Sequence, residues 1–186
     1  MTDEFARVSR WVGPQNPPAS VMPGFADASL SLARNDYFGA QLYGFRVWPE
    51  MFAFNLLIYL NPNLPSAPTA RYPNPVFNAA HLIDAGPADQ QRLFTLGVHY
   101  ADGRTASNAP QPAQATPARE LELVNAGGGG AGNYVDYAWR VRPLPPPGPV
   151  TFWCRWPYYT PDEFSIQVDA TRITAVAEQA MPLWPV

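Results

Sequence analysis

The chain has 186 residues, of which 47% are hydrophobic and 15% charged, and its formal net charge is −3. This composition is typical of a folded globular domain, and a chain of this length can bury one core without a metal or a disulfide. All twelve basic residues are arginine and they form no cluster, which disfavours a surface that tracks nucleic-acid phosphates. With 23 prolines and 13 glycines, long helices are not expected.

Membrane and secretory signals are weak. The longest nearly apolar run, residues 51–60, is about half of the ~20 residues that a membrane span requires. The chain starts with the acidic residues Asp3 and Glu4, whereas a signal peptide starts with a basic and then an apolar stretch. A single cysteine, Cys154, leaves no intrachain disulfide and no multi-cysteine metal site. We therefore expect a cytoplasmic protein.

Apolar residues recur with a period of two along most of the chain, which indicates strands. Residues 1–28 are expected to form a mostly irregular N-terminal arm, with a short edge strand at 7–12. Strands are then expected at 41–48 and 51–61. The turn between them contains Pro49, and proline presets φ at the second position of a tight turn.

The middle of the chain alternates proline-rich connections with strands. Residues 61–90 are expected to be a long connection lying over the sheet. A strand at 92–101 follows, and Asp102-Gly103 predicts a type I′ hairpin turn, because that turn needs positive φ at both central residues. The partner strand is expected at 104–108, before a second proline-rich stretch at 109–118.

Glycine and proline also mark the next connections. A strand at 119–125 leads into the glycine-rich run 127–132, which is expected to be a flexible hairpin loop feeding a strand at 133–142. The segment PLPPPGP, residues 143–149, is expected to be a stiff polyproline-type connection, since prolines cannot join a hydrogen-bonded ladder.

The last elements are strands at 150–156 and 163–169 and a helix at 169–181, which Pro182 ends. Two antiparallel sheets packed face to face bury such a set of strands best. The predicted fold is therefore an all-β, antiparallel β-sandwich of immunoglobulin-like or jelly-roll-like type. We expect a single domain over residues 1–186, with long proline-rich connections and one C-terminal helix.

Several segments together resemble a family of uncharacterised proteins from high-GC actinobacteria. The resemblance is carried by the glycine-rich run, the PLPPPGP segment, the hairpin 97–104, the strand 152–157 (FWCRWP) and residues 183–185 (LWP). It covers roughly residues 40–186. It implies a cytoplasmic bacterial protein and assigns neither an activity nor a catalytic residue.

Motifs for catalysis are weak. The glycine run lacks the lysine and the following helix that a phosphate-binding loop needs. Cys154 falls on the apolar face of its strand, and no histidine motif accompanies it. Glu120, Glu122 and Asp136 could supply the carboxylate pair of a glycoside hydrolase, but outward-facing acids are more often solvated surface. No catalytic residue, metal site or cofactor is expected.

The aromatic residues are more informative. If alternate residues of the strand 150–156 face the core, Trp153 faces outward beside Arg155, and Trp48 is expected to face outward in the same way. Exposed aromatics beside arginine are enriched in protein interfaces. The predicted binding surface and its edge consist of Trp48, Trp153, Arg155, Tyr158, Tyr159, Gly128 and Gly129. The alternative is that connections or the helix cover both sheet faces.

These patterns favour a non-enzymatic interaction or structural protein, whose partner is another protein or a second copy of the chain. We expect no nucleic-acid, membrane or metal partner. A sandwich that binds a carbohydrate or another small ligand through the same aromatics is the alternative, and a glycoside hydrolase is the third interpretation. Fold alone does not choose among them. Arg140 to Pro146 also has the RxxPxxP spacing of a polyproline ligand, but a rigid hairpin connection is the favoured interpretation.

Overall fold

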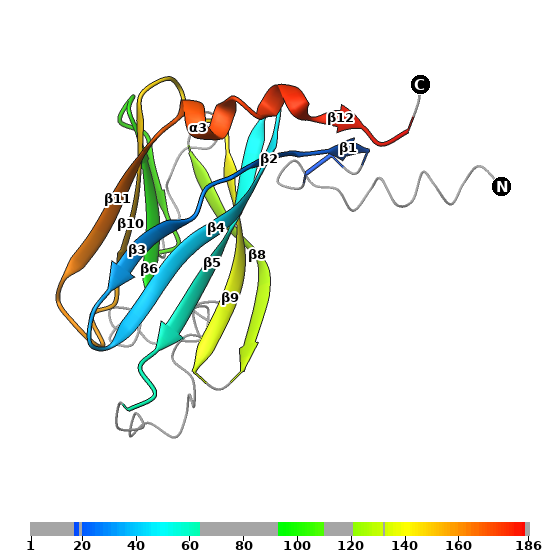
Figure 1. The fold of residues 1–186 in the computed structure, drawn as a ribbon. Coiled ribbons are helices and arrows are strands. Elements are labelled where there is room, and N and C mark those ends of the chain that lie inside the picture. Colours follow the sequence, from blue (N-terminus) through cyan, green and yellow to red (C-terminus); the bar gives the residue numbers. More distant parts are fainter. Residues whose placement is uncertain (1–16, 19, 64–92, 110–120, 132, 185–186) are drawn as a thin grey trace.

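The computed structural model describes residues 17–18, 20–63, 93–109, 121–131 and 133–184. Most of these residues form strands of two antiparallel sheets that pack face to face (Figure 1). The predicted antiparallel β-sandwich is thereby confirmed. The strand predicted at 7–12 and most of both proline-rich connections lie outside the described residues.

The larger sheet has six strands in the order β2-β4-β5-β9-β8, and β3 pairs with β4 beside β2. The strands are β2 (Gly24–Ala26), β3 (Leu30–Arg34), β4 (Phe38–Trp48), β5 (Met51–Leu60), β8 (Glu122–Ala131) and β9 (Tyr134–Arg142). The predicted turn at Pro49 joins β4 to β5. Both faces of β5 are largely apolar, which suits its place between β4 and β9.

The smaller sheet has four strands in the order β11-β10-β6-β7, namely β11 (Glu163–Asp169), β10 (Pro149–Arg155), β6 (Thr95–Tyr100) and β7 (Thr105–Ser107). The predicted hairpin between β6 and β7 is present, but its loop has a different form. The Gly103 N–H donates to the Tyr100 carbonyl (3.0 Å), and the Tyr100 N–H donates to the Arg104 carbonyl (2.9 Å). With Gly103 at φ +87°, this is a three-residue connection and not the two-residue type I′ turn.

One hydrophobic core is shared by both sheets, and alternate residues of the strands face it, as the period of two predicts. The buried residues on the inward faces are Phe52, Phe54, Leu56, Ile58, Phe94, Leu96, Val98, Tyr100, Val135, Tyr137, Trp139, Val141, Phe152, Cys154 and Trp156. Phe152 of the smaller sheet points its ring against three rings of the larger sheet. Its centroid lies 5.3 Å from that of Phe54, 6.0 Å from that of Phe45 and 6.4 Å from that of Phe52.

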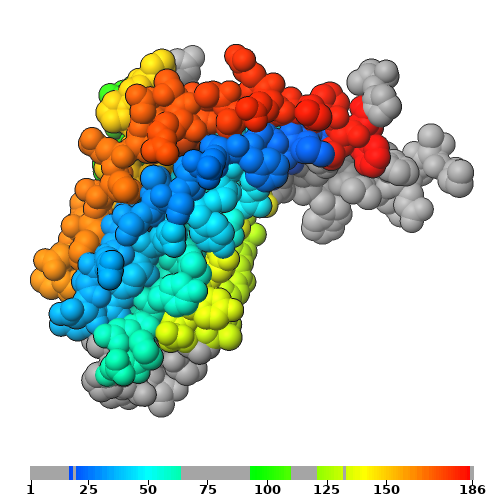
Figure 2. All heavy atoms as spheres, in the orientation of Figure 1, coloured from blue at the N-terminus to red at the C-terminus, as the bar shows by residue number. Residues whose placement is uncertain are grey.

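The described part of the N-terminal arm contains two short strands that were not predicted. They are β1 (Val21–Met22) and β2, within an arm that was expected to be mostly irregular. In Figure 2 the red C-terminal segment lies along the blue N-terminal strands at one end of the sandwich. Its last strand, β12 (Met181–Pro182), pairs with β1.

The single C-terminal helix is confirmed but is much shorter than the predicted span 169–181. It comprises α3 (Thr171–Thr174), followed by a 3-10 turn, η4 (Ala177–Gln179). A helix of about a dozen residues is marginal in isolation. The end of the predicted helix instead belongs to β12, whose backbone groups pair with those of β1. Within the described parts of the chain, no helix is long and apolar enough to cross a membrane.

The glycine-rich run was predicted to be a flexible loop, and that prediction is wrong. Residues 127–131 belong to strand β8 and pair with β9. A Cβ atom at Gly128 would lie 2.3 Å from the Asp136 carbonyl oxygen, and one at Gly130 would lie 2.2 Å from that of Tyr134. Only glycine therefore allows β8 to approach β9 this closely.

Replacing Phe152 with alanine should lower the free energy of unfolding by about 3–5 kcal/mol, because it empties the centre of the aromatic layer between the sheets. Gln167→Ala, on the exposed side of β11, is the control and should change stability by less than about 0.5 kcal/mol. Urea unfolding of both variants measures the difference. Equal stabilities would contradict the central role of Phe152.

Candidate functional site

Trp48 points away from the core as predicted, but it is not exposed. Its relative exposure is 6%. The indole Nε1 donates a hydrogen bond to the Val21 carbonyl (3.0 Å), and Val21 packs against the small apolar cluster that Trp48 forms with Met51 and Ala53. The predicted exposure of Trp48 is wrong because the N-terminal segment folds back over it.

Trp153 and Arg155 lie on the outer side of the smaller sheet. The Trp153 ring rests on Gly97, where a Cβ atom would come within 2.1 Å of it. The Arg155 guanidinium carbon lies 6.0 Å from the centroid of the same ring, and the His99 ring lies 6.2 Å away. Arg155 is exposed, whereas Trp153 is half-buried. The predicted outward direction of Trp153 is confirmed.

Tyr158 and Tyr159 follow β10 in a turn at one end of the sandwich. The Tyr159 ring meets the Trp156 ring edge-on at 4.7 Å and stacks on the Tyr37 ring at 6.0 Å. Burial, and to a smaller extent Tyr158, raises the pKa of Tyr159. This pair therefore caps the end of the core.

Gly128 and Gly129 belong to β8, at the far edge of the larger sheet. The seven residues predicted to form or border one surface are thus divided between two sheets and a terminal turn. The structure does not bring them together on one face. A binding role for each of them stays a prediction.

The acids considered for glycoside hydrolysis are also separate. Along the β8–β9 ladder, Glu122 lies opposite Arg142, whereas Asp136 lies opposite Gly129, so about 20 Å of strand separates the two acids. Hydrolysis needs carboxylates within about 10 Å of each other. Glu120 lies outside the described residues.

Cys154 is buried as predicted, and burial, together with a smaller effect of Glu163, raises its thiol pKa to about 12. A thiol in this state is not poised as a nucleophile. The part of the chain that the structure describes also contains no group of three His, Cys, Asp or Glu side chains arranged to hold a metal ion.

The structure does assemble a polar network on the side of the larger sheet that faces away from the smaller sheet, here called the outer face. The Tyr43 hydroxyl donates to Oδ2 of Asp136, and Nδ2 of Asn55 donates to Oδ1 of the same carboxylate (3.0 Å). Arg46 in turn donates from Nη2 to Oδ1 of Asn55 (2.8 Å). These four side chains come from the adjacent strands β4, β5 and β9.

A β-bulge in β4 makes this network compatible with the core. The pairing of β4 with β5 shifts register between Tyr43 and Arg46, and Gly44 in the bulge has a φ of +63°. In a regular strand, residues three apart point to opposite faces. The extra residue lets both Tyr43 and Arg46 face outward while Phe45 stays buried.

The network is partly shielded from water. Burial raises the pKa of Tyr43 to about 12, and the hydrogen bond to Asp136 and its negative charge act in the same direction. Burial also lowers the pKa of Arg140, and the nearby positive charge of Arg46 lowers it further. The outer face therefore carries fixed charges of both signs.

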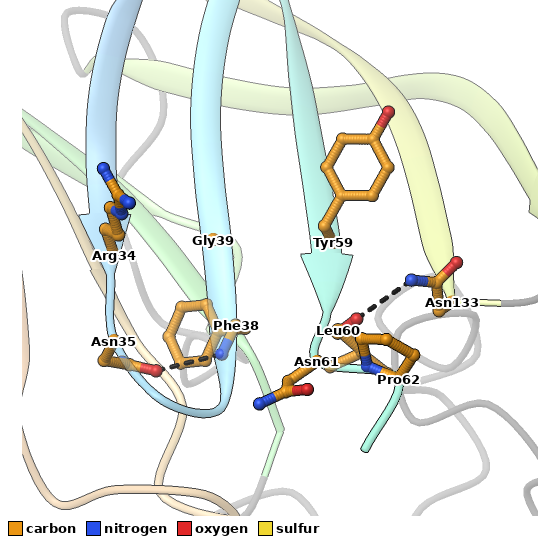
Figure 3. A pocket seen from close by; sticks show the side chains of 9 residues that line it. All are labelled: Arg34, Asn35, Phe38, Gly39, Tyr59, Leu60, Asn61, Pro62 and Asn133. Carbon is orange, nitrogen blue, oxygen red and sulfur yellow. Dashed lines mark hydrogen bonds between the residues drawn. The ribbon is translucent and has the colours of Figure 1, made fainter. Parts of the chain in front are cut away.

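A pocket of about 350 Å³ lies at one end of the outer face (Figure 3). Cross-strand pairing places Arg34, Gly39 and Tyr59 in one row over three adjacent strands. Gly39 has no side chain, so it forms a floor between Arg34 and Tyr59. Amide side chains complete the lining, together with Phe38, Leu60 and Pro62; the amides are Asn35, Asn61 and Asn133.

Exposed aromatic rings border the network. Phe25 is 63% exposed and lies opposite Arg46 in the β2–β4 pairing. Tyr59 and Tyr134 are 51% and 39% exposed, and their ring centroids lie 5.7 Å apart. The outer face thus has a hydrogen-bonded polar centre with aromatic rings on two sides.

Sequence reasoning identified only Asp136 among the residues of this network. The alternation in β5 and β9 does indicate which residues face outward, but the register that joins the strands is needed to bring Tyr43, Asn55 and Asp136 together. No protein-family model, curated protein or solved structure matches the chain, so the resemblance to actinobacterial proteins stays a prediction.

Tyr43 should make stability fall at alkaline pH. The pKa of Tyr43 in the folded protein, about 12, lies above the ordinary tyrosine pKa of 10.0, so its contribution to stability is complete below pH 10 and is lost as the pH rises through 12. Tyr43→Phe should be less stable than the wild type at pH 8 and lose less stability between pH 10 and 12. Urea unfolding at each pH tests this, with Tyr37→Phe, outside the network, as the control. An unchanged alkaline slope in Tyr43→Phe would contradict the assignment.

Proposed function

We propose that the protein is a non-enzymatic binding protein that docks a protein partner on the outer face of its larger sheet. The observation that supports this function is the group of exposed rings, Phe25, Tyr59 and Tyr134, around a polar centre. Aromatic residues and arginine are enriched at protein interfaces, where rings supply buried area and fixed polar groups supply specificity.

The state of the polar centre favours binding over catalysis. Each oxygen of the Asp136 carboxylate accepts a hydrogen bond, one from Tyr43 and the other from Asn55. The carboxylate is therefore held in place and is not directed at a substrate proton. Side chains fixed before binding lose little conformational entropy when a partner docks.

The pocket at Gly39 offers an anchor point on the same face. Arg34 provides a positive wall and Tyr59 an aromatic wall. A carboxylate or amide side chain of the partner matches these groups, because guanidinium groups bind carboxylates strongly. We place the protein in the cytoplasm, which suits its single buried, unpaired cysteine, Cys154.

The double variant Phe25→Ser/Tyr59→Ser should lose the partner, because it removes the two most exposed rings of the face. Tagged protein would be used for affinity recovery from a lysate of the organism that encodes it, with quantitative mass spectrometry. Trp184→Ser is the matched control, since Trp184 is 71% exposed but follows β12, which belongs to the two-stranded sheet with β1 and not to the larger sheet. Recovery at least tenfold lower for the double variant alone supports the proposal. Equal recovery, or no partner with the wild type, contradicts it.

A second candidate function is binding of a carbohydrate in the Gly39 pocket. The specific observation is the combination of an exposed tyrosine ring, an arginine and three asparagines around one pocket. Sugars stack on aromatic rings and form hydrogen bonds with amide and guanidinium groups.

Gly39→Val should abolish glycan binding if this second function holds, because it fills the floor of the pocket. The fold should tolerate the change, since the nearest atom to a new Cβ is the Ala33 carbonyl oxygen at 4.0 Å. Glycan-array binding would be compared with Gly129→Ala, where a Cβ meets nothing within 4 Å. Absence of glycan binding by the wild type would refute this candidate.

A further inference from the structure

Among the described residues, strand β8 forms one edge of the larger sheet. It spans ten residues and stands last in the strand order, where β9 is its pairing partner (Figure 1). Among the described residues, no strand pairs with its other side. Most of its residues are exposed or half-buried. Within the described part of the chain its outward backbone groups have no strand partner, although the Gly127 N–H donates to Oδ1 of Asn125 (2.8 Å).

This edge has few of the devices that normally prevent pairing: a bulge interrupts its pairing with β9 between Asn125 and Gly127, but charged residues and proline are scarce. Edge strands are commonly protected by charged residues, especially lysine, or by proline. Between Leu123 and Ala131, β8 contains neither proline nor any charged residue, and Glu122 at its start carries its one charge. The strand is also long, whereas β7 at the edge of the smaller sheet has three residues.

The two halves of β8 differ in shape. Residues 122–126 carry side chains, including Leu123 and Val124, whereas residues 127–130 are all glycine. At Gly129 a Cβ atom would meet nothing within 4 Å. The glycine half therefore presents a flat strip beside the side chains of the first half.

We propose that two copies of the chain pair through β8, antiparallel about a two-fold axis between Ala126 and Gly127. This arrangement places Val124 of one copy opposite Gly129 of the other, so the side chains of each copy lie beside the flat half of its partner. The two Glu122 side chains lie at opposite ends of the pair and do not repel each other. A symmetric dimer of this kind makes the same contact twice.

Antiparallel pairing of two copies fits this edge better than parallel pairing would. Parallel pairing would set the side-chain halves against each other and leave the glycine halves facing one another. The antiparallel dimer joins two six-stranded sheets into one continuous sheet. It goes beyond the proposed function, because the outer face stays open in both copies.

Gly129→Lys tests the dimer. The change adds bulk and charge to the flat strip, and the open space at this position lets the monomer keep its fold. In sedimentation equilibrium, the full-length wild type should form a particle of twice the 20.5 kDa chain mass. For Gly129→Lys, the dimer dissociation constant should rise at least tenfold. Circular dichroism and urea unfolding verify that the variant is folded.

Two further variants make the test specific. Gly39→Lys adds the same side chain to β4 of the same sheet and should remain dimeric. Val124→Glu places a carboxylate opposite residue 129 of the other copy, so mixing it with Gly129→Lys should give a heterodimer tighter than either variant alone. A wild type that is monomeric at all concentrations overturns the proposal, and so does a Gly129→Lys variant that remains dimeric.

The dimer proposal and the proposed function can be refuted independently of each other. Phe25→Ser/Tyr59→Ser removes two rings of the outer face and should lose the partner but leave the dimer intact. Gly129→Lys is tested for dimerisation alone, because a side chain at residue 129 would lie on the outer face beside Asp136, its partner in the β8–β9 pairing. Loss of the dimer in the first variant would overturn the assignment of the interface to β8.

Discussion

The aromatic layer between the two sheets is the constraint on which the rest of the structure depends. Phe152 packs against three rings of the larger sheet, and Phe38 packs against Phe94 and Trp156, whose ring centroids lie 6.3 and 5.1 Å from its own. Side chains alternate along a strand, and a slip of one residue would exchange the two faces. Burying these rings therefore determines which residues reach the outer face.

The bulge in β4 shows how this constraint is met without losing the polar network. On one side of the bulge Leu42 faces the core, and on the other side Phe45 does. The interruption falls where Tyr43 and Arg46 must both point outward to reach Asp136 and Asn55. Bulges are often found where a strand redirects a side chain for function. The register of β4 against β5, with its shift at the bulge, thus determines both which residues are buried and which form the network.

The sequence predicts those parts of the fold that depend on local alternation, and misses those that depend on distant contacts. Alternation was sufficient to assign the buried faces of β5, β6, β9 and β10. Trp48 has the outward position that alternation predicts, but Val21, far away in the sequence, covers it. The glycines of β8 have no side chains and thus no pattern, so their pairing with β9 could not be predicted. The Tyr43–Asn55–Asp136 group was hidden for a related reason, since its members come from three strands whose register only the folded sheet defines.

The close approach of Gly24 to Val176 links the two ends of the described chain. A Cβ atom at residue 24 would lie 1.9 Å from the Val176 carbonyl oxygen, and Met22 pairs with Met181 just beyond. Domains fold as units during synthesis, generally from the N-terminal side. Strand β1 nevertheless gains its partner only after residue 182 has left the ribosome. During translation β1 therefore stays unpaired until β12 emerges, even where the rest of the sandwich has already formed.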